Sequence, residues 1–173
     1  MRLFDQLKAV FFGQPAKADR AALGGEPTQP LERRKKPRVD ARKGTRVLII
    51  DDSPTVLTYL RKMFASAGYV PLLAANAERG LHMARRVHPE LVVLDVIMPG
   101  MNGFAALRHI RRDPEVRDVP VIMMSGNEQA SEQFYVMRIG ADGFMKKPFS
   151  RADLFGRIEP MLDEDAVPRR PRA

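Results

Sequence analysis

Two hydrophobic patterns alternate between residues 45 and 162. Continuous apolar runs at 47–50, 91–94 and 121–124 predict strands that are buried on both faces of a parallel sheet. Two further strands are expected over 69–74 and 142–146, and helical spacing predicts five helices that end near residues 67, 87, 112, 139 and 162. Five strands that alternate with five helices through right-handed crossovers indicate a three-layer α/β fold.

The segments on either side of this pattern differ from it in composition. Leu3, Phe4, Leu7, Val10 and Phe11 have helical spacing and predict a short amphipathic helix over about 3–12. Such a short helix is marginal in water, so it needs the chain's own domain, a partner groove or a membrane surface to dock on. Residues 13–44 are expected to form a flexible basic linker, and residues 163–173 a disordered tail.

Charge is concentrated in the N-terminal extension. The chain of 173 residues has a net charge of +8, of which residues 1–44 contribute +6 and residues 45–162 only +2. The basic cluster over 33–43 lacks aromatic residues, so we interpret it as a solvated linker rather than a nucleic-acid site. The absence of cysteine excludes disulfides and thiolate metal sites and suits a cytoplasmic protein. No apolar run exceeds four residues, so no membrane-spanning segment is expected.

Polar residues with complementary chemistry follow the predicted strands. They are Asp51, Asp52, Asp95, Ser125 and Lys147. Because the carboxyl ends of parallel strands share one edge of a sheet, these residues are expected to converge. Crowded carboxylates favour a bound divalent cation such as Mg²⁺, while the lysine and the serine hydroxyl suit the oxygens of an oxyanion. The pattern therefore predicts phosphoryl transfer to an aspartate.

These motifs resemble the receiver domain of bacterial two-component response regulators over residues 45–162. The resemblance rests on Ile-Ile-Asp-Asp-Ser at 49–53, Asp-Val-Ile-Met-Pro-Gly-Met-Asn-Gly at 95–103, Ser125, and Phe-Met-Lys-Lys-Pro-Phe at 144–149. It implies a flavodoxin-like five-stranded parallel sheet in the order 2-1-3-4-5. The loop at 98–103 and the flanking Ser-Pro-Thr and Lys-Pro-Phe segments are most similar to chemotaxis-like regulators of type IV pilus and twitching-motility systems.

The resemblance also implies a role for each site residue. Asp95 corresponds to the phosphoacceptor, Asp51, Asp52, Asp95 and the Ile97 carbonyl to the ligands of Mg²⁺ or Mn²⁺, and Ser125 and Lys147 to the residues that hold the phosphoryl oxygens. Phe144 corresponds to an aromatic switch, and the Lys147–Pro148 peptide bond is expected to be cis. Ile97 and Asn127 occupy the positions that modulate dephosphorylation. Because Ile97 has no polar group to orient water, a long-lived phosphoryl-aspartate is expected.

The expected function is that of a phosphoacceptor regulator rather than an enzyme, apart from its own phosphorylation and dephosphorylation. The implied partners are a histidine kinase and a downstream protein that binds the face of the fourth helix, fifth strand and fifth helix. No DNA-binding domain is expected after residue 162. Two alternatives remain open: an adaptor whose N-terminal helix, within residues 1–14, recruits the receiver to a membrane, cell pole or partner, and an aspartate-dependent phosphotransferase or phosphatase.

Overall fold

The computed structural model describes residues 39–126 and 137–170. These residues belong to one compact unit that begins at Val39. The predicted helix over 3–12, the linker as far as residue 38, and most of the helix expected before residue 139 lie outside the described residues, as does Asn127.

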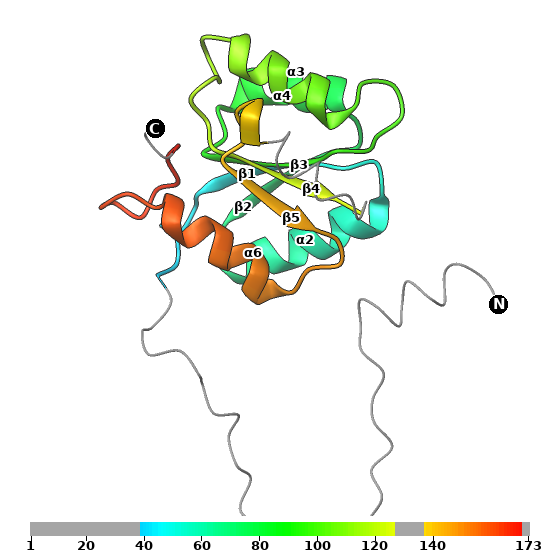
Figure 1. The fold of residues 1–173 in the computed structure, drawn as a ribbon. Helices are drawn as coiled ribbons and strands as arrows, with labels where there is room; N and C mark the ends of the chain where they lie inside the picture. The colour runs from blue at the N-terminus through cyan, green and yellow to red at the C-terminus, as the bar shows by residue number, and fades with distance from the viewer. Residues whose placement is uncertain (1–38, 127–136, 171–173) are drawn as a thin grey trace, which may run out of the picture. The chain divides into compact units, whose positions relative to one another are not determined.

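The centre of the domain is a five-stranded parallel sheet (Figure 1). Its strands are β1 (Arg46–Ile50), β2 (Val70–Ala74), β3 (Leu91–Asp95), β4 (Val121–Ser125) and β5 (Gly143–Lys146). Their order is β2-β1-β3-β4-β5, which confirms the predicted topology. All residues of β3 and β4 are buried, as the unbroken apolar runs predict for strands covered on both faces.

Helices cover both faces of the sheet. Figure 1 shows α2 (Pro54–Ser66) and α6 (Arg151–Ile158) on one side, and α3 (Ala77–Val87) and α4 (Gly103–Arg112) on the other. Two hydrophobic clusters fill the spaces between the layers, one around Phe64 and Phe155 and the other around Leu107 and Ile110. Among the described residues, no helix is both long enough and apolar enough to cross a bilayer.

Capping residues set the ends of the helices. Ser53, Asn76, Asn102 and Ser150 each accept a hydrogen bond from a backbone N–H in the first turn of the helix that follows. The helix predicted to run to residue 162 instead ends at Ile158 and continues as a 3₁₀ turn over Glu159–Met161. Pro160 explains the change, because proline has no N–H to continue the α-helical hydrogen bonds.

The C-terminal segment packs on the domain as far as residue 170, so the prediction of a disordered tail is wrong for residues 163–170. Asp163 Oδ1 accepts a hydrogen bond from Val167 N at 2.9 Å, and Val167 is only 4 % exposed. Arg170 Nε lies 2.9 Å from Oδ1 of Asp142, the residue directly before β5. The apolar Val167 and the ion pair of Arg170 together hold this highly charged segment in place.

Candidate functional site

Four polar residues lie at the carboxyl ends of the strands, on one edge of the sheet. Asp51 directly follows β1, Asp95 and Ser125 end β3 and β4, and Lys147 directly follows β5. Asp51 and Ser125 are fully buried and Asp95 is 5 % exposed, although all three are polar. Burial of polar groups has a free-energy cost unless they are paired, so their partners define the chemistry of the site.

Lys147 connects two of the carboxylates. Its Nζ lies 2.7 Å from Asp51 Oδ2 and 2.8 Å from Asp95 Oδ1. Burial lowers the pKa of Lys147, but the charges and hydrogen bonds of Asp51 and Asp95 outweigh that effect and leave the pKa raised. The ammonium is therefore a permanent positive charge between the two carboxylates.

Asp95 has the environment of a nucleophile. Burial raises its pKa to about 6, while the hydrogen bond and the charge of Lys147 oppose the rise. At neutral pH the carboxylate is therefore mainly ionised, and it faces less bulk water than a surface aspartate does.

The donor set of the site fits a hard divalent cation. Carboxylate oxygens of Asp51, Asp52 and Asp95 lie within 4.8 Å of one another. Asp52 is exposed, whereas Asp51 is fixed by the backbone N–H of Ser53, which donates to its Oδ1 at 2.9 Å. Oxygen ligands with one face open to solvent suit Mg²⁺, which retains several waters. Asp51, Asp52 and Asp95 would hold the ion together.

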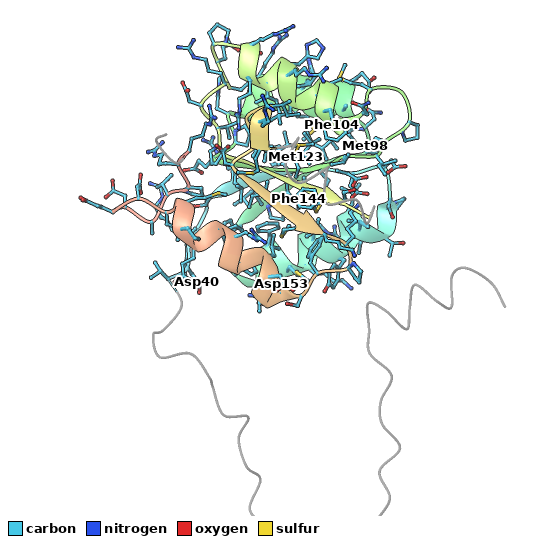
Figure 2. All side chains as sticks on the ribbon, in the orientation of Figure 1. Asp40, Met98, Phe104, Met123, Phe144 and Asp153 are labelled. Atoms are coloured by element: carbon cyan, nitrogen blue, oxygen red, sulfur yellow. The ribbon has the colours of Figure 1, made fainter. Side chains whose placement is uncertain are left out.

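The remaining predicted positions lie around this centre. Ser125 accepts a backbone hydrogen bond from Lys147 N at 2.7 Å, which joins the ends of β4 and β5. The Lys147–Pro148 peptide bond is cis, as the resemblance implies. Ile97 is 59 % exposed. Phe144 is buried opposite Met123 in the register of β4 and β5, and both are labelled in Figure 2.

Gly103 is a positioning residue, although the sequence pattern predicts only a loop there. A Cβ at this position would collide with the carbonyl oxygen of Asp95 and lie 2.9 Å from Val96 Cα. Gly103 N also donates to Val96 O at 2.9 Å. The first turn of α4 therefore lies directly against the end of β3, and only glycine permits this approach. The Asn-Gly pair at the start of the predicted helix was the sequence feature that could have indicated this close contact.

We expect Gly103→Ala to lower the free energy of unfolding by about 1–3 kcal/mol, the usual range for overpacking. Because the clash is with the backbone of Asp95, the rate of aspartate phosphorylation is also expected to fall, by about tenfold or more. Urea denaturation and phosphorylation kinetics measure the two effects. The matched control is Gly156→Ala, whose added Cβ would have no neighbour within 4 Å. Equal stabilities of the two variants would contradict the prediction.

The sequence is similar to a known protein family and to individual proteins. A family model described as the response regulator receiver domain matches residues 47–159. Protein PilH of Pseudomonas aeruginosa is 36 % identical over 117 residues, which cover 68 % of this chain and 97 % of that protein. A probable transcriptional regulator, ycf27 of Porphyridium aerugineum, is 34 % identical over 68 % of this chain, but the match spans only 48 % of that protein.

Solved structures show the same architecture. The chemotaxis protein CheY4 of Vibrio cholerae superposes with a TM-score of 0.65 at 25 % identity, covering 69 % of this chain and 99 % of that one. CheY in a CheX–CheY–BeF₃–Mg²⁺ complex from Borrelia burgdorferi superposes with a TM-score of 0.65 at 27 % identity, covering 70 % of this chain and 92 % of that one.

Proposed function

The chain belongs to the response regulator receiver domain family, and we propose that Asp95 is the residue through which it receives a phosphoryl group. Receiver domains are signalling modules of two-component systems that interact with histidine kinases and downstream targets. The observation that carries the proposal is the arrangement of Asp95, which is buried at a strand end, bound by Lys147 and adjacent to two further carboxylates.

We propose a part in the transfer for each of these side chains. A carboxylate oxygen of Asp95 forms a bond to phosphorus while the bond from phosphorus to the kinase histidine nitrogen breaks, and that nitrogen keeps the electron pair. As this bond forms, Lys147 exchanges its contact with Asp95 for a phosphoryl oxygen, and Ser125 donates its hydroxyl hydrogen to another. Hydrolysis by water restores the free carboxylate and releases phosphate.

Asp51, Asp52, Asp95 and the Ile97 carbonyl are the proposed ligands of Mg²⁺ or Mn²⁺. The clustered carboxylate oxygens support this assignment, as does the Mg²⁺ named with the similar CheY of B. burgdorferi. When bound, the ion supplies positive charge that neutralises the phosphoryl oxygens.

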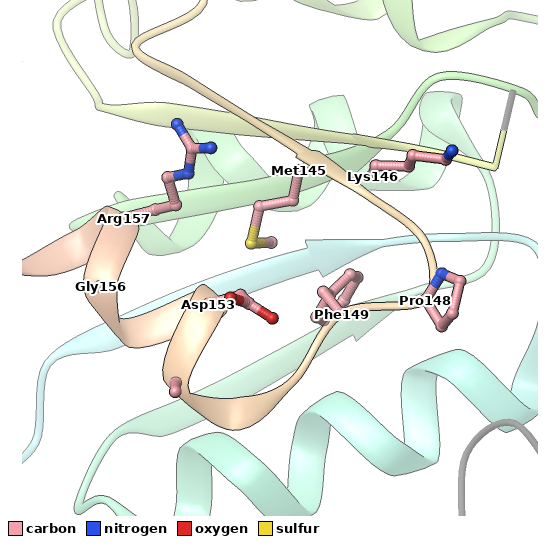
Figure 3. A pocket seen from close by; sticks show the side chains of 8 residues that line it. Met145, Lys146, Pro148, Phe149, Asp153, Gly156 and Arg157 are labelled. Carbon is pink, nitrogen blue, oxygen red and sulfur yellow. The ribbon is translucent and has the colours of Figure 1, made fainter. Parts of the chain in front are cut away.

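The proposed output surface includes β5 and α6. Figure 3 shows Met145, Phe149 and Asp153 around a pocket between these elements. A neighbouring pocket is lined by Phe144 and Met137, and Met137 is 46 % exposed. Because Phe144 both borders this pocket and lies one strand from Ser125, a shift of its ring would alter the surface that a partner meets.

The pathway assignment is also a proposal. Similarity over nearly the whole length of PilH favours a role in type IV pilus or chemosensory motility. The transcriptional regulators, in contrast, match over about half of their length. Recruitment by residues 1–14 is a separate proposal, supported by the apolar spacing of that sequence.

Intact-mass measurement tests the proposed phosphoacceptor. The full chain is incubated with a small phosphoryl donor, with Mg²⁺ or with a chelator, beside Asp95→Asn. We expect a gain of one phosphoryl group that requires Mg²⁺ and is absent from the variant. A gain of the same size in Asp95→Asn would assign the phosphoryl group to another residue and reject the proposal.

The side chain of Ile97 is expected to prolong the life of the phosphoryl group. It is exposed beside the site but has no polar atom to orient an attacking water. Ile97→Glu should therefore shorten the phosphoryl half-life by about 100-fold, the low end of general base catalysis. Loss of phosphate is followed after removal of the donor, with Ile97→Leu as the control. An unchanged half-life in Ile97→Glu would contradict the role.

A further inference from the structure

The outer surface of α3 and α4 concentrates the positive charge of the folded domain. These two helices contain six arginines and a single acidic residue, Glu78. The rest of residues 45–162 contains nine basic and twelve acidic residues. Figure 2 shows nitrogen-tipped side chains over these helices. One face of the domain is therefore basic, although the domain as a whole is nearly balanced in charge.

Ion pairs account for the positions of Arg85 and Arg111. Arg111 turns inward to Asp142 at 2.6 Å, and Arg85 reaches Asp113 after α4 at 2.6 Å. The other four side chains belong to exposed residues: Arg79, Arg86, Arg108 and Arg112. Within the described part of the chain, no carboxylate pairs with Arg79, Arg86 or Arg112. Their charge therefore faces solvent.

The chemistry of this surface suits phosphate groups. All six basic residues of the two helices are arginine and none is lysine. A guanidinium is less strongly hydrated than an ammonium and binds phosphate or carboxylate through two parallel hydrogen bonds. A surface that serves only solubility usually mixes the two signs of charge.

The surface lacks the apolar centre of a protein interface. The exposed large hydrophobic residues of the described chain are Val39, Val70, Ile97 and Met137, none of which belongs to α3 or α4. Protein interfaces usually contain buried aromatic or aliphatic anchors at their centre. An extended polyanion, in contrast, requires only an array of positive charges.

The N-terminal sequence favours a lipid surface over a nucleic acid. Residues 3–12 have apolar side chains at helical spacing, which can enter a bilayer but have no counterpart in a phosphodiester backbone. A single short apolar segment binds a membrane weakly, and stable attachment needs a second, basic signal. We infer that the arginine face of α3 and α4 supplies this signal by contacting the phosphates of an anionic bilayer. This inference deepens the proposed recruitment by residues 1–14 and is independent of the role of Asp95.

Vesicle sedimentation of the full chain tests the inference. The vesicles are phosphatidylcholine alone, or phosphatidylcholine with about one-third phosphatidylglycerol. The test variant is Arg79→Gln/Arg86→Gln/Arg112→Gln. The matched control, Arg61→Gln/Lys62→Gln/Arg157→Gln, removes three exposed charges from α2 and α6. We expect the wild type and the control to bind anionic vesicles in low salt, and the test variant to bind about 100-fold more weakly.

Equal binding by the test variant and the wild type would overturn the inference. So would wild-type binding to duplex DNA but not to anionic vesicles, which would make the face a nucleic-acid site. A separate variant, Leu7→Glu/Phe11→Glu, reports on the N-terminal segment: retained binding would reject recruitment by that segment while leaving the arginine face supported. The phosphoryl mass gain of each variant is measured in parallel, so a failure of the Asp95 assignment is recognised independently.

Discussion

Arg111→Met is expected to lower the free energy of unfolding by about 3–5 kcal/mol, the range for removing one partner of a buried ion pair. The Arg111 guanidinium donates to the carbonyls of Gly140 at 2.7 Å and Val119 at 2.8 Å, and to Asp142 Oδ2 at 2.6 Å. Burial lowers the pKa of Arg111 to about 10, although Asp142 opposes the shift, so the group remains charged. The substitution removes this partner of Asp142, whose side chain is 4 % exposed, and leaves it with Arg170 and the backbone N–H of Val121.

The neighbouring arginine provides the control for this prediction. Arg112 is exposed on the same helix, so Arg112→Met should change stability by no more than about 0.5 kcal/mol. Urea denaturation gives both values, and Arg111→Lys, which retains a positive charge, should have an intermediate effect. If Arg111→Met and Arg112→Met lower the free energy of unfolding by similar amounts, the buried hydrogen bonds and ion pair of Arg111 do not contribute to stability as predicted.

The sequence predicts the strands and the site for the same physical reason. Strands buried on both faces must be continuously apolar, so the polar residue after each strand marks its end clearly. Parallel strands then bring those ends together without any information about loop conformation. Asp51, Asp95 and Lys147 were therefore predictable as neighbours although they are far apart in the chain.

Other features depend on contacts that a linear pattern does not reveal. Arg111 differs little from Arg108 and Arg112 in sequence, and its inward direction depends on Asp142, 31 residues away. Its position four residues after Leu107, at the border of the buried helix face, was the only local signal. The packed C-terminal segment was missed because the composition of residues 163–170 resembles a disordered tail, whereas Val167 and Arg170 find partners only in the folded domain.

Lys147→Met is expected to slow phosphorylation of Asp95 by about 100-fold to 1000-fold, the usual cost of losing a preorganised group that stabilises charge in the transition state. Its Nζ contacts both buried carboxylates at 2.7–2.8 Å, and in the proposed transfer it would meet the phosphoryl oxygens as they develop their charge. The variant should also be destabilised, because the fully buried Asp51 loses its cationic partner. Mg²⁺ should restore more stability to the variant than it adds to the wild type, since the carboxylates then depend on the ion alone.

Lys146→Met is the control for this prediction, because Lys146 is the exposed neighbour of Lys147 and also carries one positive charge. This variant should be phosphorylated at close to the wild-type rate. Mg²⁺ should raise its stability by about as much as it raises that of the wild type. The rate is followed by intact mass, and stability by urea denaturation with and without Mg²⁺. If Lys147→Met loses stability but keeps its rate, Lys147 is only a structural partner of Asp51. If both variants lose rate equally, the effect comes from net charge near the site rather than from the direct contacts of Lys147 with Asp51 and Asp95.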